Sequence, residues 1–214
     1  MSSHFRVRIC VPLATAVLLA LFFPALAADD PAPCHVAAAA APLTEEWSEL
    51  RIPDTALVDQ NGQPVHFYSD LIQDRIVAIN FIYTTCTTIC PPMAATFARL
   101  QQELQGRDVH LISVTLDPVT DTPQRLKEWS TKFRAQPGWT LVTGEKAEVD
   151  HLLKALGVFA PNKEEHSPII LAGNDAAGQW TRASGLAPPA KLRELLERLG
   201  EAPIRTAISE RSGR

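Results

Sequence analysis

The chain has 214 residues, of which 46% are hydrophobic and 21% charged, a composition typical of an ordinary globular protein. This length fits one domain with flanking sequence and is long enough to bury a sizeable core. The formal net charge of −4 gives no support for a nucleic-acid partner.

The N-terminus has the features of a secretory signal peptide over residues 1–28. Arg6 and Arg8 form a basic segment, residues 10–23 are almost entirely apolar, and Ala25-Leu26-Ala27 is an A-x-A cleavage site. The apolar run is shorter than the roughly 20 residues that a membrane-spanning helix needs. A cleaved leader is therefore favoured, with an uncleaved N-terminal anchor as the alternative. Either interpretation places the domain outside the cytoplasm, in a bacterial periplasm.

Beyond the leader, residues 29–46 form an Ala/Pro-rich linker, residues 47–200 the folded domain and residues 201–214 a polar tail. The linker contains Cys34-His35, which is either a spare thiol or a weak auxiliary metal site. A C-x-x-C-H motif is absent there, so covalent haem is not expected. With Cys10 in the leader and Cys86 pairing with Cys90, Cys34 is an odd thiol in an oxidising compartment.

Strands and helices alternate along the domain. The Asn-Gly pair within residues 55–67 predicts a β-hairpin. A polar break at residues 69–75 then precedes further strands and helices, assigned from apolar runs and 3.6-residue periodicity. The predicted elements are a strand over 76–82, a helix after Cys90 that ends at Gly106, a strand over 109–116, a helix opened by an N-cap arrangement at Asp121-Thr122-Pro123, a strand over 139–142, a helix over 146–156, an antiparallel pair over 168–171 and 179–182, and a helix over 188–199.

This order predicts an α/β fold with a mixed central sheet, flanking helices and an extra N-terminal β-hairpin. The strand over 76–82 is apolar without alternation, which is typical of the interior of a parallel sheet. A Cys-x-x-x-Cys segment, Cys86 to Cys90, lies where this strand ends and a helix begins. That placement points to a thioredoxin-like three-layer sandwich.

The two thiols are placed for redox chemistry or for binding a soft metal. Pro91 and Pro92 suit the first turn of a helix, so Cys90 lies near the positive end of the helix dipole, which favours thiolates. The spacing of Cys86 and Cys90 leaves room for an ion between the sulfurs and still permits a disulfide. A purely structural disulfide is the alternative, but so small a loop would stabilise little by the chain-entropy model. Two thiolates suit Cu(I), and an added imidazole would also hold Cu(II).

Two segments resemble the Sco/SenC family of copper chaperones. Thr85-Cys86-Thr87-Thr88-Ile89-Cys90-Pro91 is similar to the family's C-x-x-x-C-P motif. Residues 113–118, running on to Asp121-Thr122-Pro123, resemble its S-V-D-P-x-x-D-T-P segment with one residue inserted. The resemblance covers about residues 52–199. It implies a thioredoxin-like Sco domain and a copper site.

The same resemblance implies the remaining members of the site. The family completes its copper site with a histidine in a D-H-[ST] segment, and Glu165-His166-Ser167 matches that position. The resemblance therefore implies Cys86, Cys90 and His166 as copper ligands. It also implies Asp117 near the metal, in a hydrogen-bonding role behind the ligands. An aromatic residue that the family usually has shortly after the histidine is missing from residues 168–172.

The leading hypothesis is a periplasmic protein that binds copper as Cu(I) or Cu(II). By family inference it delivers copper to the binuclear copper site of a haem-copper cytochrome oxidase, reduces the thiols of that site, or both. Its partner would be the apo copper subunit of the oxidase or another periplasmic copper protein. The chain is expected to be a monomer and to contact membrane only through an uncleaved leader.

A second hypothesis is an enzyme, a thiol–disulfide oxidoreductase or a thiol peroxidase without obligatory metal, acting through Cys86 and Cys90. Ser167-Pro168-Ile169 supports it, because this segment resembles the cis-proline loop that faces the cysteines in thioredoxin-like oxidoreductases. The two hypotheses differ at His166, which a copper site needs and a dithiol enzyme does not. A redox or copper sensor that binds a partner protein is a third hypothesis.

Overall fold

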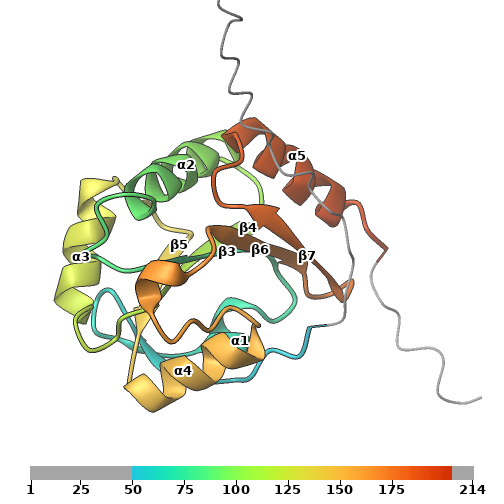
Figure 1. The fold of residues 1–214 in the computed structure, drawn as a ribbon. Helices are drawn as coiled ribbons and strands as arrows, with labels where there is room; N and C mark the ends of the chain where they lie inside the picture. Colours follow the sequence, from blue (N-terminus) through green and yellow to red (C-terminus); the bar gives the residue numbers. More distant parts are fainter. Residues whose placement is uncertain (1–49, 204–214) are drawn as a thin grey trace, which may run out of the picture. The chain divides into compact units, whose positions relative to one another are not determined.

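A computed structural model describes residues 50–203, which form one mixed β-sheet of seven strands with helices on both faces (Figure 1). The strands lie in the order β2-β1-β5-β4-β3-β6-β7. Their bounds are Ala56–Asp59 (β1), Pro64–His66 (β2), Ile76–Ile82 (β3), Val109–Thr115 (β4), Trp139–Thr143 (β5), Ile169–Asn174 (β6) and Gln179–Ser184 (β7).

The centre of the sheet is parallel, and this determines where the site lies. β3 pairs in parallel with β4, and β4 with β5, whereas the other pairings, β1–β2, β1–β5, β3–β6 and β6–β7, are antiparallel. Ile82 at the end of β3 pairs with Thr115 at the end of β4. The loops that follow these two strands therefore start side by side at one edge of the sheet. One loop contains Cys86, and the other contains Asp117 and Asp121.

Helices cover the two faces of the sheet as separate layers. The helices α2 (Cys90–Glu103), α3 (Pro123–Lys132) and α5 (Pro189–Gly200) pack on one face. The helices α1 (Phe67–Leu71) and α4 (Lys146–Ala155) pack on the other, as Figure 1 shows. Each layer encloses its own apolar cluster, and only the first cluster contains Cys86 and Cys90.

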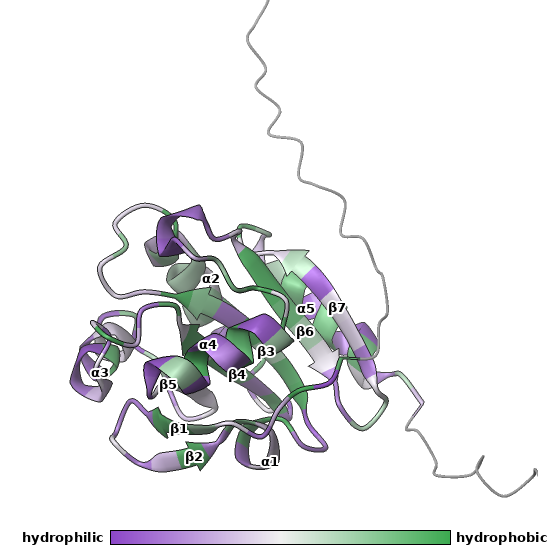
Figure 2. Cartoon of the chain, turned by 60° about the horizontal axis from the view of Figure 1, so that its bottom comes forward, coloured by the Kyte–Doolittle hydropathy of each residue, from purple (hydrophilic) through white to green (hydrophobic). Residues whose placement is uncertain are grey.

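Burial on both faces explains the sequence of the central strand. Six of the seven residues of β3 are buried, because Ala78 and Ile82 face the α2 layer while Val77, Ile79 and Phe81 face the α4 layer. Figure 2 shows this as hydrophobic colouring along the central strands and hydrophilic colouring on the outer parts of the helices. A strand covered on both sides needs no polar alternation.

The predicted architecture is confirmed, including the N-terminal hairpin and the order of the elements. The strand predicted over 76–82 has those bounds. No helix within residues 50–203 is long and apolar enough to span a bilayer. The predicted leader, linker and nearly all of the polar tail lie outside the described residues, so their boundaries stay predictions.

Two details differ from the sequence-based expectations, and a third, the isomer of the peptide bond preceding Pro168, is one that the sequence does not determine. The supposed polar break over 69–75 contains part of α1, which forms because Phe67 and Leu71 are both buried. Thr122 rather than Asp121 is the N-cap of α3, and its side chain accepts a hydrogen bond from the N–H of Arg125. All peptide bonds between residues 50 and 203, including the one preceding Pro168, are trans, so the resemblance to a cis-proline loop does not extend to the backbone.

Candidate metal and redox site

The cysteine loop connects the end of β3 to the start of α2. The Cys86 N–H donates to the carbonyl of Tyr83 at 3.1 Å, which closes a tight turn directly after the strand. The Cys90 N–H in turn donates to the Cys86 sulfur at 3.3 Å. Proline follows at the first positions of the helix, where a missing N–H costs nothing. The first N–H of the helix, which has no partner within the helix, thus donates to the Cys86 sulfur.

The two cysteines are free and buried, with Cys86 5% and Cys90 0% exposed. Between them, Thr87 and Thr88 lie on the surface. Both cysteines belong to the apolar cluster on the α2 side of the sheet, but Cys86 directly precedes the exposed loop residues and Cys90 begins the helix.

The electrostatic environments of the two thiols also differ. Burial alone would raise the pKa of the Cys86 thiol, but hydrogen bonds donated to its sulfur, chiefly by the Cys90 N–H, outweigh burial and lower the pKa to about 6. Burial raises the pKa of the Cys90 thiol to about 12, and the neighbouring Cys86 adds to the increase. At neutral pH, Cys86 is mainly a thiolate and Cys90 a thiol, so Cys86 is the nucleophile of the pair.

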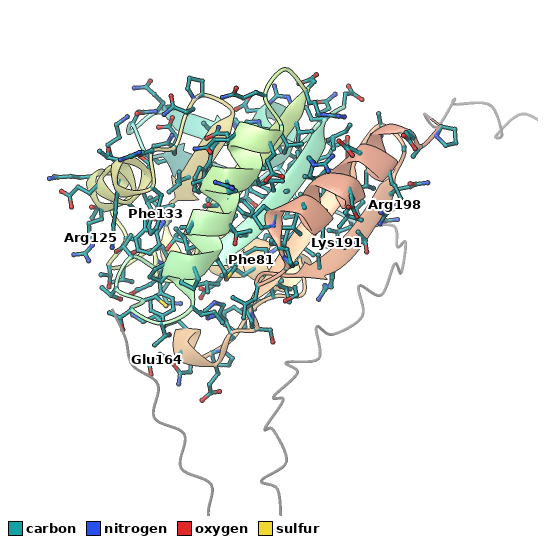
Figure 3. All side chains as sticks on the ribbon, turned by 90° about the horizontal axis from the view of Figure 1, so that it is seen from above. Phe81, Arg125, Phe133, Glu164, Lys191 and Arg198 are labelled. Atoms are coloured by element: carbon teal, nitrogen blue, oxygen red, sulfur yellow. The ribbon has the colours of Figure 1, made fainter. Side chains whose placement is uncertain are left out.

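A buried carboxylate fixes the start of the cysteine loop. Asp121 is 0% exposed and accepts hydrogen bonds from the N–H of Thr84 at 3.0 Å, from the Thr84 hydroxyl at 2.5 Å and from the Thr115 hydroxyl at 2.6 Å. Arg125 of α3, labelled in Figure 3, donates from Nε to the same Thr84 hydroxyl at 3.1 Å. Asp121 therefore joins the ends of β3 and β4 and is more than the helix cap that its sequence context suggested.

His166 follows the short 3-10 helix η1 (Lys163–Glu165), which Asn162 caps by accepting the Glu164 N–H at 3.1 Å. Glu164 marks this segment in Figure 3, beside the end of α2 that the cysteine loop enters. The His166 imidazole lies edge-on to the Tyr83 ring, with 5.8 Å between ring centroids and 76° between planes. Although Tyr83 and His166 are far apart in sequence, the fold thus places His166 beside the residue that joins β3 to the cysteine loop.

The protonation pattern of His166 suits a metal ligand. Its Nδ1 lies 2.6 Å from the carbonyl oxygen of Lys163. Because a carbonyl can only accept, Nδ1 is the donor in this hydrogen bond, which leaves Nε2 as the ring nitrogen that can offer a lone pair to a metal. Nε2 is buried and has no hydrogen-bond partner among the described residues. A ring held through one nitrogen with the other nitrogen unused is the usual arrangement of a metal-binding histidine.

Cys86, Cys90 and His166 nevertheless do not form a complete ligand cluster in this structure. Within residues 50–203, no group of three or more His, Cys, Asp or Glu side chains is placed to hold a metal ion. Joint coordination by the two thiols and the imidazole therefore stays a prediction. The donor set itself, two soft sulfurs and one imidazole nitrogen without a partner, fits copper.

Asp117 lies at the start of the loop after β4 and pairs with the ammonium of Lys163. Burial would raise the pKa of the Asp117 carboxyl, but the hydrogen bonds from Lys163 and Thr120 and the charge of Lys163 together outweigh it, so the pKa is lowered. Asp117 is therefore linked to His166 through Lys163, the residue whose carbonyl holds the imidazole. Its predicted hydrogen-bonding role behind the ligands stays a prediction.

Two residues of this site had no functional assignment from the sequence. Tyr83 is an aromatic neighbour of His166. Residues 168–172, which follow the histidine, contain no aromatic residue. The position of Tyr83 directly after a buried strand, three residues before Cys86, is a signal that could have identified it. Lys163 carried no such signal, because its partners are remote in sequence.

Comparison with known proteins supports the same family. The model of the SCO1/SenC family matches residues 50–175, more than half of the chain. A Stutzerimonas stutzeri protein described as copper-binding is 37% identical over 120 residues, which are 54% of this chain and 57% of that relative. The chain thus matches little more than half the length of this relative.

Solved structures of Sco proteins have the same thioredoxin-like fold. The structure of BsSco, described as a member of the Sco family of cytochrome c oxidase assembly proteins with a disulfide switch, has a TM-score of 0.63 and 24% identity, and the match covers 74% of this chain and 98% of that one. Yeast Sco1 with copper bound has a TM-score of 0.63 and 19% identity, covering 77% of this chain and 96% of that one. The predicted fold class is confirmed.

Proposed function

Because this chain belongs to the SCO1/SenC family, we propose that it binds copper through Cys86, Cys90 and His166 and transfers it to an apo copper protein. One observation carries the proposal: the buried Nε2 of His166 has no hydrogen-bond partner within residues 50–203, at the end of the sheet where two free thiols lie. The copper-binding description of the Stutzerimonas stutzeri relative and the copper-bound yeast Sco1 structure support it.

The proposed target is the binuclear copper site of a haem-copper cytochrome oxidase, in the periplasm. The description of BsSco as an oxidase assembly protein supports the target, and the signal-peptide features of residues 1–28 support the compartment. Uncleaved, the same leader would anchor the domain to the membrane. Copper is the cargo in this proposal, and the protein supplies a site that binds it reversibly.

The same residues also support reduction of a target disulfide by a chain that carries no copper. The Cys86 thiolate attacks one target sulfur, the target S–S bond breaks, and the other target sulfur leaves as a thiolate. Cys90 then loses its proton to a base or to that thiolate and attacks the Cys86 sulfur. The products are a Cys86–Cys90 disulfide and a target dithiol, so two electrons pass from this chain to the target. The difference between the two thiol pKa values supports this order of attack.

A second candidate function is a thiol–disulfide oxidoreductase or thiol peroxidase that does not require metal. The reactive Cys86 and the buried Cys90 favour it, because a nucleophilic thiol with a resolving partner is sufficient for such chemistry. It differs from the leading proposal in giving His166 no part in the reaction.

An anaerobic copper titration separates the two candidates. The chain contains four cysteines, so the titration uses full-length protein in which Cys10→Ser and Cys34→Ser leave Cys86 and Cys90 as the only thiols. We expect one tightly bound copper per reduced chain and a sulfur-to-Cu(II) charge-transfer band that His166→Ala removes or shifts. Weak binding that is unchanged by His166→Ala, together with rapid disulfide reduction, would instead favour the oxidoreductase.

A further inference from the structure

Lys163 connects three parts of the site. Its ammonium pairs with Asp117, on the loop after β4. The same ammonium lies 5.2 Å from the centre of the Tyr83 ring, at the end of β3. Its backbone carbonyl accepts the hydrogen bond from Nδ1 of His166 at 2.6 Å. One residue therefore contacts the loop after β4, the strand end before the cysteines and the histidine itself.

These contacts are partly shielded from water. The side chain of Lys163 is 33% exposed and that of Asp117 only 13%. The pair is thus less screened than exposed ion pairs, which typically contribute little. The Tyr83 ring contacts both the Lys163 ammonium and the His166 imidazole. The lysine and the histidine therefore share one neighbour, Tyr83, which directly follows the buried strand β3.

The segment that carries His166 has little regular structure of its own. Between α4 and β6, the described elements comprise only the three-residue η1, and both Glu164 and Glu165 are exposed. A short 3-10 turn does not hold a side chain in place without tertiary contacts. Lys163 supplies such contacts three residues before His166.

We propose that Lys163, through its ion pair with Asp117 and its contact with Tyr83, is a positioning residue that holds His166 at the cysteine end of the sheet. This inference rests on the proposed role of His166 as a copper ligand and adds the means by which the ligand is presented. Asp117 then acts on the site through Lys163. Loss of the ammonium frees the segment while leaving both thiols and the imidazole intact.

The test compares Lys163→Met, Asp117→Asn and their combination in the full-length chain with Cys10→Ser and Cys34→Ser. Methionine keeps an unbranched apolar stem and removes the charge. Lys163→Arg, which can restore the ion pair, is the conservative rescue. Lys146→Met is the matched control, because Lys146 pairs with Asp150 in α4 on the other face of the sheet. The readouts are Cu(II) affinity and backbone amide exchange at Glu165, whose N–H donates to the Asn162 carbonyl.

We expect Lys163→Met and Asp117→Asn each to weaken Cu(II) binding about 10-fold or more, as removal of groups that orient metal ligands typically does. The double variant should bind Cu(II) no more weakly than whichever single variant has the lower affinity, because each substitution already removes the same Lys163–Asp117 ion pair. Exchange at Glu165 should become faster in Lys163→Met and recover in Lys163→Arg. Lys146→Met should change neither quantity.

Three results would overturn the inference, and the third would also overturn the proposed function. If His166→Ala weakens copper binding but Lys163→Met does not, or if exchange at Glu165 is unchanged, Lys163 is not a positioning residue and the proposed function stands. If His166→Ala itself leaves copper binding unchanged, the proposed function fails, and the inference fails with it.

Discussion

At the scale of single residues, the site depends on the difference between two identical side chains. Cys86 and Cys90 are both thiols, but a helix N–H points at the first and the apolar core surrounds the second. The hydrogen bonds stabilise the anionic form of Cys86, while burial destabilises the anionic form of Cys90. The local backbone thus favours Cys86 as the attacking thiol and Cys90 as the resolving thiol in the proposed thiol–disulfide exchange.

This difference predicts the pH dependence of thiol alkylation. A chain with Cys10→Ser, Cys34→Ser and Cys90→Ser keeps Cys86 as its only thiol and retains the residue-90 N–H. The pKa of Cys86 is lowered to about 6, so its thiolate fraction rises as the pH increases through that value. We expect the iodoacetamide rate to reach half its maximum near pH 6 and to be level by about pH 8.

The corresponding control keeps Cys90 and replaces Cys86 by serine. Because burial raises the pKa of Cys90 to about 12, alkylation should be slow at neutral pH and still increase above pH 9. A half-maximal rate near pH 9 for Cys86 would contradict the role that we assign to the loop hydrogen bonds.

At the scale of elements, Asp121 holds together the two strand ends that form the site. It accepts hydrogen bonds from residues at the ends of both β3 and β4 while fully buried. Asp121→Ala would leave the Thr84 N–H and the Thr115 hydroxyl without their acceptor. Since unsatisfied buried donors are costly, we expect a loss of about 3 kcal/mol in the free energy of unfolding, measured by urea denaturation.

Thr122→Ala is the natural comparison, because Thr122 is the actual cap of α3. Loss of one helix cap should cost about 1 kcal/mol. If the two variants were equally stable, Asp121 would contribute no more than a cap does, and the connection between β3 and β4 would have to come from other contacts.

The strand β3 and the Asp121-Thr122-Pro123 segment show what the sequence could predict at this scale. The bounds of β3 followed from an apolar run without alternation, because burial on both faces leaves that pattern. The Asp-Thr-Pro segment correctly predicted the start of a helix, since capping is a local property. One partner of Asp121 is Thr84, 37 residues earlier, and no local pattern contains that information.

The site could be predicted to a similar extent. Cys86 and Cys90 were identifiable because their spacing and the following prolines are local features. Lys163 was not, because its partner Asp117 is 46 residues away and belongs to another loop. His166 was found only through the family resemblance, and its unused Nε2 became visible only in the folded chain. The sequence therefore did not predict the tertiary contacts that support the site, such as the Lys163–Asp117 ion pair.

At the scale of the whole domain, the proposed copper site joins the end of β3, the start of α2 and the segment before β6. A ligand that binds only the folded state stabilises that state, by about 2.7 kcal/mol when its free concentration is 100 times its Kd. For a domain of this size, that free energy corresponds to an increase of roughly 5 to 10 °C in Tm. We therefore expect buffered Cu(I) to raise the Tm of the reduced chain by this amount.

The comparison must be made within each redox state, since a disulfide changes Tm by itself. Oxidised chain with a Cys86–Cys90 disulfide has no thiolates to offer, so copper should leave its Tm unchanged. Reduced chain with both Cys86→Ser and Cys90→Ser should behave in the same way. An equal shift in Tm for oxidised and reduced protein, measured by calorimetry with and without copper, would mean that the metal binds away from the two cysteines. Because the cysteines lie in the cluster shared by α2, α3 and α5, a true site should stabilise the domain as one cooperative unit.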